Sequence, residues 1–315
     1  MNRRTLLTRA GLLAAVGGAA WWARETVFWP APEAAFGRGG RTPWLPMARA
    51  ASQPTVRVIV DGVETVALID SGAPYSVVDR AWRRAGGGSE TFAAPMVAFG
   101  LGGHAQLGRG TRLDVALPGL AIRDLHAAVL DMGPVAGAGG LGTPLILGQD
   151  VLRRMVLELD PRARRLRLVA RDGFVADPSM VAAPVRRGGG LTAEVTVEGA
   201  TVRALIDTGA SGVLALDRTT ARAAGLLDGR RTTRSDSAVL GGLLSAQAVE
   251  ARTVTFARQL YRGVSVGIYD RPPLPNFPNA LIGMEAFAER RVALDLGGGA
   301  LHASRLMDIS VGTGL

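Results

Sequence analysis

The sequence contains no cysteine, which excludes disulfide bonds, thiolate nucleophiles and metal sites built on thiolates. It also contains no lysine, so the formal net charge of +9 is carried by arginine. Its three histidines, His104, His126 and His302, stand far apart and match no metal-ligand spacing. We therefore expect neither a metal nor a cofactor. Any catalysis would have to depend on carboxylates and hydroxyls.

Basic runs interleaved with aromatic residues are also missing, although such runs are typical of proteins that bind nucleic acids. The arginines occur in scattered pairs, such as those at 83–84, 153–154 and 290–291. This pattern predicts an arginine-rich, solvated surface and no nucleic-acid partner.

The N-terminus differs in character from the rest of the chain. Residues 1–23 combine a charged start with about fourteen apolar or small residues from Ala10, the length of a signal h-region. A membrane-spanning helix needs about 20 apolar residues. Arg3 and Arg4, followed by Thr-Leu-Leu, resemble a twin-arginine export signal of bacteria. We expect a cleaved signal peptide or a retained inner-membrane anchor, and hence a periplasmic or secreted protein.

The remaining chain divides into a short irregular stretch and a globular part. Residues 24–51 are rich in proline, glycine and tryptophan, and we expect them to form a tether or processing segment outside the core fold. Hydrophobic residues make up 48% of the chain, which suits one large or two modest domains with a real core.

One motif occurs twice. The stretch VIVDGVETVALID ends at Asp70, and VTVEGATVRALID ends at Asp207. In each, alternating β-branched residues lead to an acidic residue and a glycine (61–62 and 198–199), and a second apolar run follows. This pattern predicts a β-hairpin whose turn has positive φ angles. Each hairpin would deliver its aspartate at a strand end.

The downstream sequence repeats as well, in the same order. A short segment of helical character follows each aspartate, then a glycine-rich hairpin tip, then two apolar residues and a glycine. That glycine is Gly148, 78 residues after Asp70, and Gly283, 76 residues after Asp207. Four features in the same order indicate a duplicated domain. The remaining segments read as short strands with glycine turns, which predicts an all-β fold.

The duplication divides the chain into two lobes and a connection. We expect lobe 1 at residues 52–170 and lobe 2 at residues 191–315. Between them, residues 171–190 contain two prolines and a run of three glycines, which predicts a linker.

These repeated motifs resemble those of retropepsin-like aspartic proteases, with both lobes in one polypeptide. Ala73 and Ala210 follow the motif glycines, as in retropepsin-like enzymes. The resemblance implies two β-barrel lobes with the active site between them, in a protein that is active as a monomer. Pairing of two chains, each lobe completing a neighbour's site, is the alternative assembly.

The resemblance also implies roles for individual residues. Asp70 and Asp207 would be the catalytic pair, which shares one proton because two carboxylates so close cannot both ionise. Four residues would support the pair, two through hydroxyls that lock the loops and two through the absence of a Cβ: Ser71, Thr208, Gly72 and Gly209. Four further glycines would lie in flaps over the substrate: Gly102, Gly103, Gly241 and Gly242.

We therefore expect an aspartic endopeptidase that acts on a peptide or protein substrate outside the cytoplasm. The alternative is a catalytically weak peptide-binding module that retains the protease cleft. Its support is Pro74, which lacks a backbone donor where lobe 2 has Ser211. Two ordinary turn-capping aspartates would be the non-catalytic interpretation of the motif pair.

Overall fold

The computed structural model consists mainly of β-strands. It describes residues 30–86, 91–99, 105–137, 140–239, 242–270 and 277–304. The expected signal peptide or anchor at residues 1–23 lies outside the described residues. Within these ranges, every helix is too short or too polar to cross a membrane.

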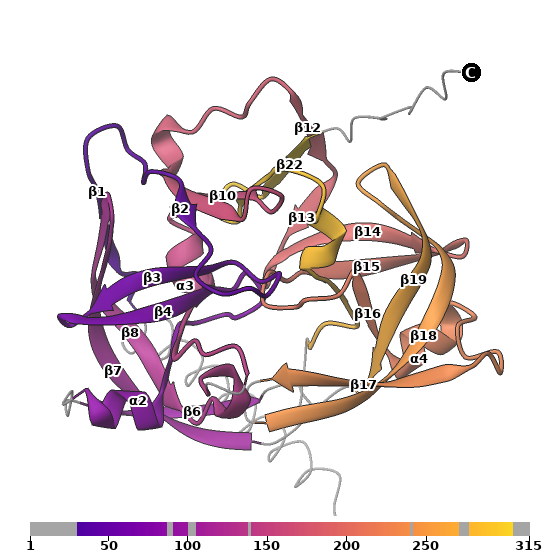
Figure 1. Cartoon of the computed structure of the whole chain (residues 1–315), viewed down its shortest axis with the longest axis horizontal. Helices are drawn as coiled ribbons and strands as arrows, with labels where there is room; N and C mark the ends of the chain where they lie inside the picture. The colour runs from indigo at the N-terminus through magenta and orange to yellow at the C-terminus, as the bar shows by residue number, and fades with distance from the viewer. Residues whose placement is uncertain are drawn as a thin grey trace, which may run out of the picture.

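Lobe 1 is a closed barrel of six strands, drawn in indigo to magenta in Figure 1. β7 pairs with β3 on one side and with β8 on the other, which closes the ring. Along β3, buried valines alternate with exposed residues, so one face of the strand points into the barrel. The order around the barrel is β3 (Thr55–Val60), β4 (Val63–Ile69), β9 (Leu145–Leu147), β5 (Val77–Asp79), β8 (Leu120–Leu130) and β7 (Ala105–Leu117).

Lobe 2 repeats this barrel with the same topology. Pairing of β14 with β18 closes the ring, as pairing of β3 with β7 does in lobe 1. The order is β14 (Leu191–Val197), β15 (Ala200–Ile206), β20 (Ala280–Ile282), β16 (Leu214–Asp217), β19 (Gln259–Tyr269) and β18 (Gly242–Phe256). The predicted all-β fold with two duplicated lobes is confirmed.

The predicted hairpin turns are present in both lobes. Asp61 and Glu198 have φ angles of 48° and 46°, and the glycines that follow have φ angles of 86° and 93°. Each acidic side chain also accepts a hydrogen bond from the backbone N–H of a neighbouring barrel strand, at Asp114 (2.8 Å) and Arg252 (2.7 Å). The acidic residue therefore both forms the turn and ties it to the barrel.

Short helices follow the aspartate loops, as the sequence predicts. α2 (Arg80–Ala85) and α4 (Arg218–Ala223) each begin at an aspartate, Asp79 or Asp217, whose side chain caps the helix. α3 (Gln149–Leu152) and the 3-10 turn η4 (Met284–Phe287) begin after Gly148 and Gly283. The other 3-10 turns are η2 (Gly133–Val135) and η3 (Arg171–Gly173).

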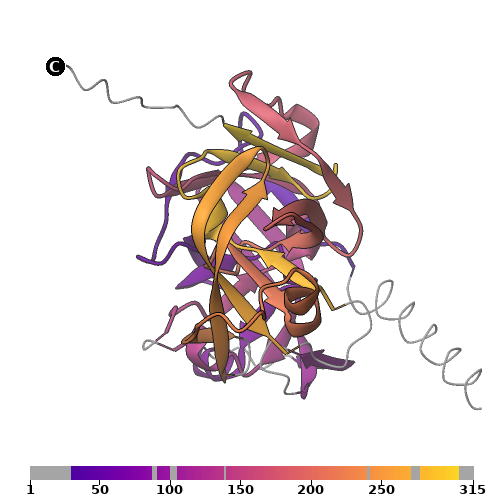
Figure 2. The same cartoon turned by 90° about the vertical axis from the view of Figure 1, so that its right-hand side faces the viewer.

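A third sheet joins the lobes at the top of Figures 1 and 2. Its centre is the antiparallel pair of β10 from lobe 1 and β21 from lobe 2, in which Leu157 lies opposite Leu294. The order of its six strands is β12 (Met180–Ala183), β22 (Ala300–Ser304), β21 (Val292–Asp295), β10 (Met155–Asp160), β11 (Arg165–Ala170) and β2 (Leu45–Pro46).

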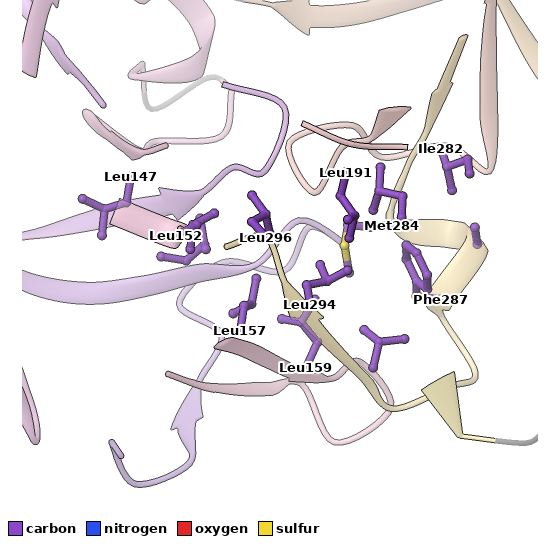
Figure 3. Close-up of a cluster of buried hydrophobic side chains, with 14 of the residues drawn as sticks. Leu147, Leu152, Leu157, Leu159, Leu191, Ile282, Met284, Phe287, Leu294 and Leu296 are labelled. Atoms are coloured by element: carbon purple, nitrogen blue, oxygen red, sulfur yellow. The ribbon is translucent and has the colours of Figure 1, made fainter. Parts of the chain in front are cut away.

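The hydrophobic core is continuous through both lobes. Figure 3 shows leucines of β10 and β21 meeting between the lobes, next to Met284 and Phe287. These side chains belong to one cluster with residues of both barrels, such as Leu147 and Ile282, and all are at most 4% exposed. The two lobes therefore share buried apolar surface, which opposes their separation.

Residues 30–51 do not form the expected tether, at least over the described part that begins at Pro30. β1 (Glu33–Phe36) pairs with β8, and β2 pairs with β11. Between them, the Thr42 hydroxyl accepts a hydrogen bond from Leu168 N–H (3.0 Å), and Trp44 stacks with Arg165 and Arg167. Pro46 lies within β2, and glycines lie between the two strands, without preventing their edge pairing.

Residues 171–190 are likewise more than a linker. β12 pairs with β22 as β2 pairs with β11, and β13 (Val185–Arg187) pairs with β14. β12 and β2 therefore occupy equivalent edges of the third sheet, each beside the last strand of its own lobe. The duplicated unit accordingly includes a capping strand ahead of each barrel.

Two hairpins stand where the sequence predicts flaps. β6 (Thr91–Phe99) pairs with β7, and β17 (Thr232–Val239) pairs with β18; both lie at the end of the molecule opposite the third sheet (Figure 1). Gly242 begins β18, opposite Val239. The other three flap glycines, Gly102, Gly103 and Gly241, lie outside the described residues.

Candidate active site

Both motif aspartates lie at the ends of equivalent barrel strands. Asp70 follows β4 and Asp207 follows β15. A parallel neighbour strand fixes each of them, because Asp70 N–H donates to Leu147 O and Asp207 N–H to Ile282 O, both at 2.9 Å. Apolar strands thus carry the two aspartates to the boundary between the lobes.

Each carboxylate is held by the backbone of its own loop. Asp70 Oδ1 accepts hydrogen bonds from the N–H groups of Gly72 (2.8 Å) and Ala73 (3.1 Å). Asp207 Oδ1 accepts the equivalent bonds from Gly209 (2.8 Å) and Ala210 (3.2 Å). Two donors on Oδ1 fix the plane of each carboxylate, and these loop bonds leave Oδ2 unused.

The two loops also approach each other crosswise. A Cβ placed on Gly72 would lie 2.5 Å from Asp207 Cγ, and one placed on Gly209 would lie 2.5 Å from Asp70 Oδ2. Any side chain at either position would collide with a carboxylate of the other lobe. The motif glycines therefore allow the two aspartates to come together.

Ser71 and Thr208 lock the loops beneath the aspartates. Thr208 Oγ1 accepts a hydrogen bond from Ser71 N–H (2.9 Å) and donates to Ile69 O (2.6 Å). Ser71 Oγ accepts from Thr208 N–H (3.0 Å) and donates to Ile206 O (2.7 Å). Both side chains are buried, so these bonds cannot be replaced by water without opening the contact between the lobes.

A second pair of glycines supports the loops from below. A Cβ on Gly148 would lie 2.6–2.8 Å from backbone atoms of Tyr75 and Ala73. A Cβ on Gly283 would meet the backbone of Ala210 and Gly212 in the same way. The apolar-apolar-Gly motif therefore provides close packing under each aspartate loop.

Electrostatics at the pair favour a shared proton. Burial raises the pKa of Asp207 well above its ordinary value, and repulsion by the Asp70 carboxylate raises it further. Burial also raises the pKa of Asp70, but the N–H groups of Gly72 and Ala73 oppose that rise. The pair therefore binds its first proton more strongly than an isolated aspartate does.

One buried carboxyl beside the site is not predicted by the sequence analysis. Asp150 accepts hydrogen bonds from Ser76 N–H and Ser76 Oγ, both at 2.9 Å, and so holds the end of the first aspartate loop. Burial raises the pKa of Asp150 to about 6. Lobe 2 has Val213 and Glu285 at the equivalent positions, so comparison of the repeats gives no signal for this pair.

The remaining candidate residues contribute less to the site. Tyr75, next to the first motif, is partly buried and packs against the cluster that contains Leu68 and Val77. His104 lies outside the described residues. Across the described ranges, no three histidine, aspartate or glutamate side chains gather in a group that could hold a metal ion.

Comparison with known proteins agrees with this geometry. A protein-family model described as aspartyl protease matches the chain twice, over residues 56–151 and residues 193–286. The chain belongs to the aspartyl protease family. The two matches coincide with the two barrels, so this aspartyl protease fold carries both lobes in one chain, and the resemblance to retropepsin-like proteins is confirmed. The search of curated proteins gave no match.

Proposed function

We propose that this member of the aspartyl protease family is an aspartic endopeptidase in which Asp70 and Asp207 activate water to hydrolyse peptide bonds. The observation that carries the proposal is the crosswise contact of the loops, in which the Gly72 and Gly209 backbones bring the two carboxylates together. A carboxyl pair that shares one proton suits general acid–base catalysis at acid to neutral pH.

The reaction follows from the shared proton. The ionised carboxylate takes a proton from a water molecule, whose oxygen attacks the peptide carbonyl carbon. The protonated carboxyl donates to the carbonyl oxygen, and a tetrahedral intermediate forms. Proton transfer to the leaving nitrogen then breaks the C–N bond, and the pair again holds one proton. No covalent bond to the protein is formed.

We propose a peptide or protein as substrate, bound in extended form. The hairpins β6–β7 and β17–β18 would act as flaps, whose strands offer backbone groups for pairing with such a chain. The intact pair within one chain supports action as a monomer. No nucleic-acid partner is proposed, because arginine-rich segments with interleaved aromatics are absent from the sequence.

We also propose that the protein acts in the periplasm or after secretion. The support is the N-terminal sequence, with Arg3 and Arg4 before an apolar stretch. Whether that stretch is cleaved or retained as a tether to the inner membrane is decided by N-terminal sequencing of the protein recovered from its native host.

The decisive experiment compares the full chain with its Asp70→Asn and Asp207→Asn variants on a mixed peptide library, from acid to neutral pH. We expect both variants to lose at least about 1,000-fold in kcat/KM, because neither can share a proton. Asp217→Asn is the matched control, since Asp217 is a buried helix cap away from the pair. Full cleavage by Asp207→Asn would contradict the proposal.

Peptide binding without cleavage by the wild type would favour the alternative, a binding module that retains the fold. Pro74 is the observation behind it, because it occupies an exposed position in the first aspartate loop and has no N–H to donate. Replacement of Pro74 by serine, the residue of lobe 2, would then be expected to increase cleavage.

A further inference from the structure

Gln149 is a buried polar residue that directly contacts the first aspartate loop. It is the first residue of α3, and its side chain is 0% exposed. Nε2 donates to Ser71 O (2.9 Å) and to Gly189 O (3.1 Å), while Oε1 accepts from Arg153 Nη2 (2.9 Å). Both amide hydrogens and the amide oxygen are therefore engaged, and these partners determine the orientation of the amide.

The bond to Ser71 acts on a peptide unit that also holds a catalytic carboxylate. Ser71 C=O and Gly72 N–H belong to the same peptide plane. The carbonyl end of this plane accepts from Gln149, and the N–H end donates to Asp70 Oδ1 at 2.8 Å. Because the unit is planar, fixing its oxygen also fixes the direction of the N–H. Hydrogen bonding at the oxygen also polarises the donor.

The bond to Gly189 reaches the other lobe. Gly189 lies in the turn between β13 and β14, and β14 is the first barrel strand of lobe 2. The neighbouring Gly190 passes so close that a Cβ there would lie 3.0 Å from Gln149 Nε2. Gln149 thus connects the Asp70 loop to the strand pair that ends at Asp207.

In the described part of lobe 2, the equivalent position makes no such connection. The residue that follows Gly283, as Gln149 follows Gly148, is Met284, which is buried and apolar. The second aspartate loop is held there by backbone N–H groups alone, from Met284 to Ala210 O and from Glu285 to Ser211 O, both at 2.9 Å. Close packing under the loop therefore does not require an amide side chain at this position.

We propose that Gln149 is a positioning residue, which fixes the Ser71–Gly72 peptide and through it the Asp70 carboxylate relative to lobe 2. This inference rests on the proposed function, because the carboxylate position matters for a catalytic pair. The titratable groups around the loop are Asp207, which faces Asp70, and Asp150, which binds Ser76 from the next position of α3. Arg153 is the only cation that contacts the Gln149 amide in the described structure.

The test substitutes Gln149→Met in the full chain, which gives lobe 1 the residue of lobe 2. Thr42→Val is the matched control, because it also removes a buried hydrogen bond, that from Leu168 N–H on the third sheet. For Gln149→Met we expect kcat to fall about tenfold with little change in KM. The acid limb of the pH profile should shift upward by about one unit, because Asp70 loses a well-directed donor. Thr42→Val should lower stability without moving the profile.

Titration of ¹³C-labelled aspartate carboxyls by NMR provides a readout that needs no turnover. An upward shift of the pair's lower titration in Gln149→Met, but not in Thr42→Val, would support the positioning role. Identical titrations in all three proteins, with equal losses of stability in both variants, would overturn it. If the wild type cleaves no peptide, the proposed function fails while the NMR comparison still decides the role of Gln149.

Discussion

The Cα atom of Gly72 faces the carboxylate of Asp207, so closely that a Cβ on Gly72 would lie within 2.5–2.7 Å of Asp207 Cγ and both carboxylate oxygens. Real Cβ atoms do not approach other atoms to this distance, and the Asp207 carboxylate is held in place by the N–H groups of Gly209 and Ala210. The separation of the two aspartates is thus set by a residue of the opposite loop.

This contact predicts the effect of Gly72→Ala. The added methyl group should push the loops apart and lower kcat/KM by at least about 100-fold, because a misplaced catalytic group loses its alignment. Gly173→Ala is the control, since a Cβ at that exposed glycine meets no atom within 4 Å. Activity of Gly72→Ala equal to that of the control would show that the loops tolerate a wider spacing.

The hydroxyl lock predicts non-additive losses of stability. Ser71→Ala and Thr208→Val each remove two buried hydrogen bonds, so each should lower the free energy of unfolding by about 2–3 kcal/mol. The double variant should lose less stability than the sum of the two single losses. Once the first hydroxyl is removed, the contact between the loops is already weakened, so removal of the second costs less. Urea unfolding measures the free energy of unfolding of the two single variants and of the double variant. Strict additivity would mean that the hydroxyls act independently. Ser179→Ala, at an exposed position, is the control and should change the free energy of unfolding little.

The raised pKa of Asp150 predicts that the stability of the protein depends on pH between about pH 4 and pH 6. Its folded pKa of about 6 exceeds the unfolded value near 3.8, so its contribution to stability is full below the unfolded value and is lost as the pH rises through the folded one. Relative to wild type, Asp150→Asn should therefore gain up to about 3 kcal/mol between pH 4 and pH 7. Parallel curves of stability against pH for wild type and Asp150→Asn would contradict this. Asp172→Asn, at an exposed position, serves as the control.

Deletion variants test the structural role of residues 30–51. Removal of residues 1–29 retains β1 and β2 and should leave the thermal unfolding midpoint unchanged. Removal of residues 1–51 exposes the edges of β8 and β11 and the apolar surface under Leu45, so it should cost about 3 kcal/mol or more. Equal midpoints for the two deletions would show that these edge strands are dispensable.

The sequence predicts the barrels and the aspartate pair because the motifs for both occur twice, once in each lobe, and each motif is a strong local signal. Alternating strands, an acidic-Gly turn and the Asp-(Ser/Thr)-Gly motif can each be recognised within a few residues. The edge strands of residues 30–51 have no such signal, since β2 comprises two residues and depends on pairing with distant β11. The roles of Asp150 and Gln149 are missed for the opposite reason: comparison of repeats reveals what the lobes share and hides what only one lobe has.

The arrangement of strands along the chain has a consequence for the order of assembly. Asp207 is anchored to β20, and the lobes are joined by β21, so both of these strands are synthesised after the whole of lobe 1. Lobe 1 can collapse earlier, because domains fold as they leave the ribosome. The carboxylate of Asp70 in lobe 1 then has no Asp207 beside it until residues 280–295 have been added. The two acidic groups therefore meet only after residues 280–295 have been synthesised, and a nascent chain with lobe 1 alone lacks the carboxyl pair.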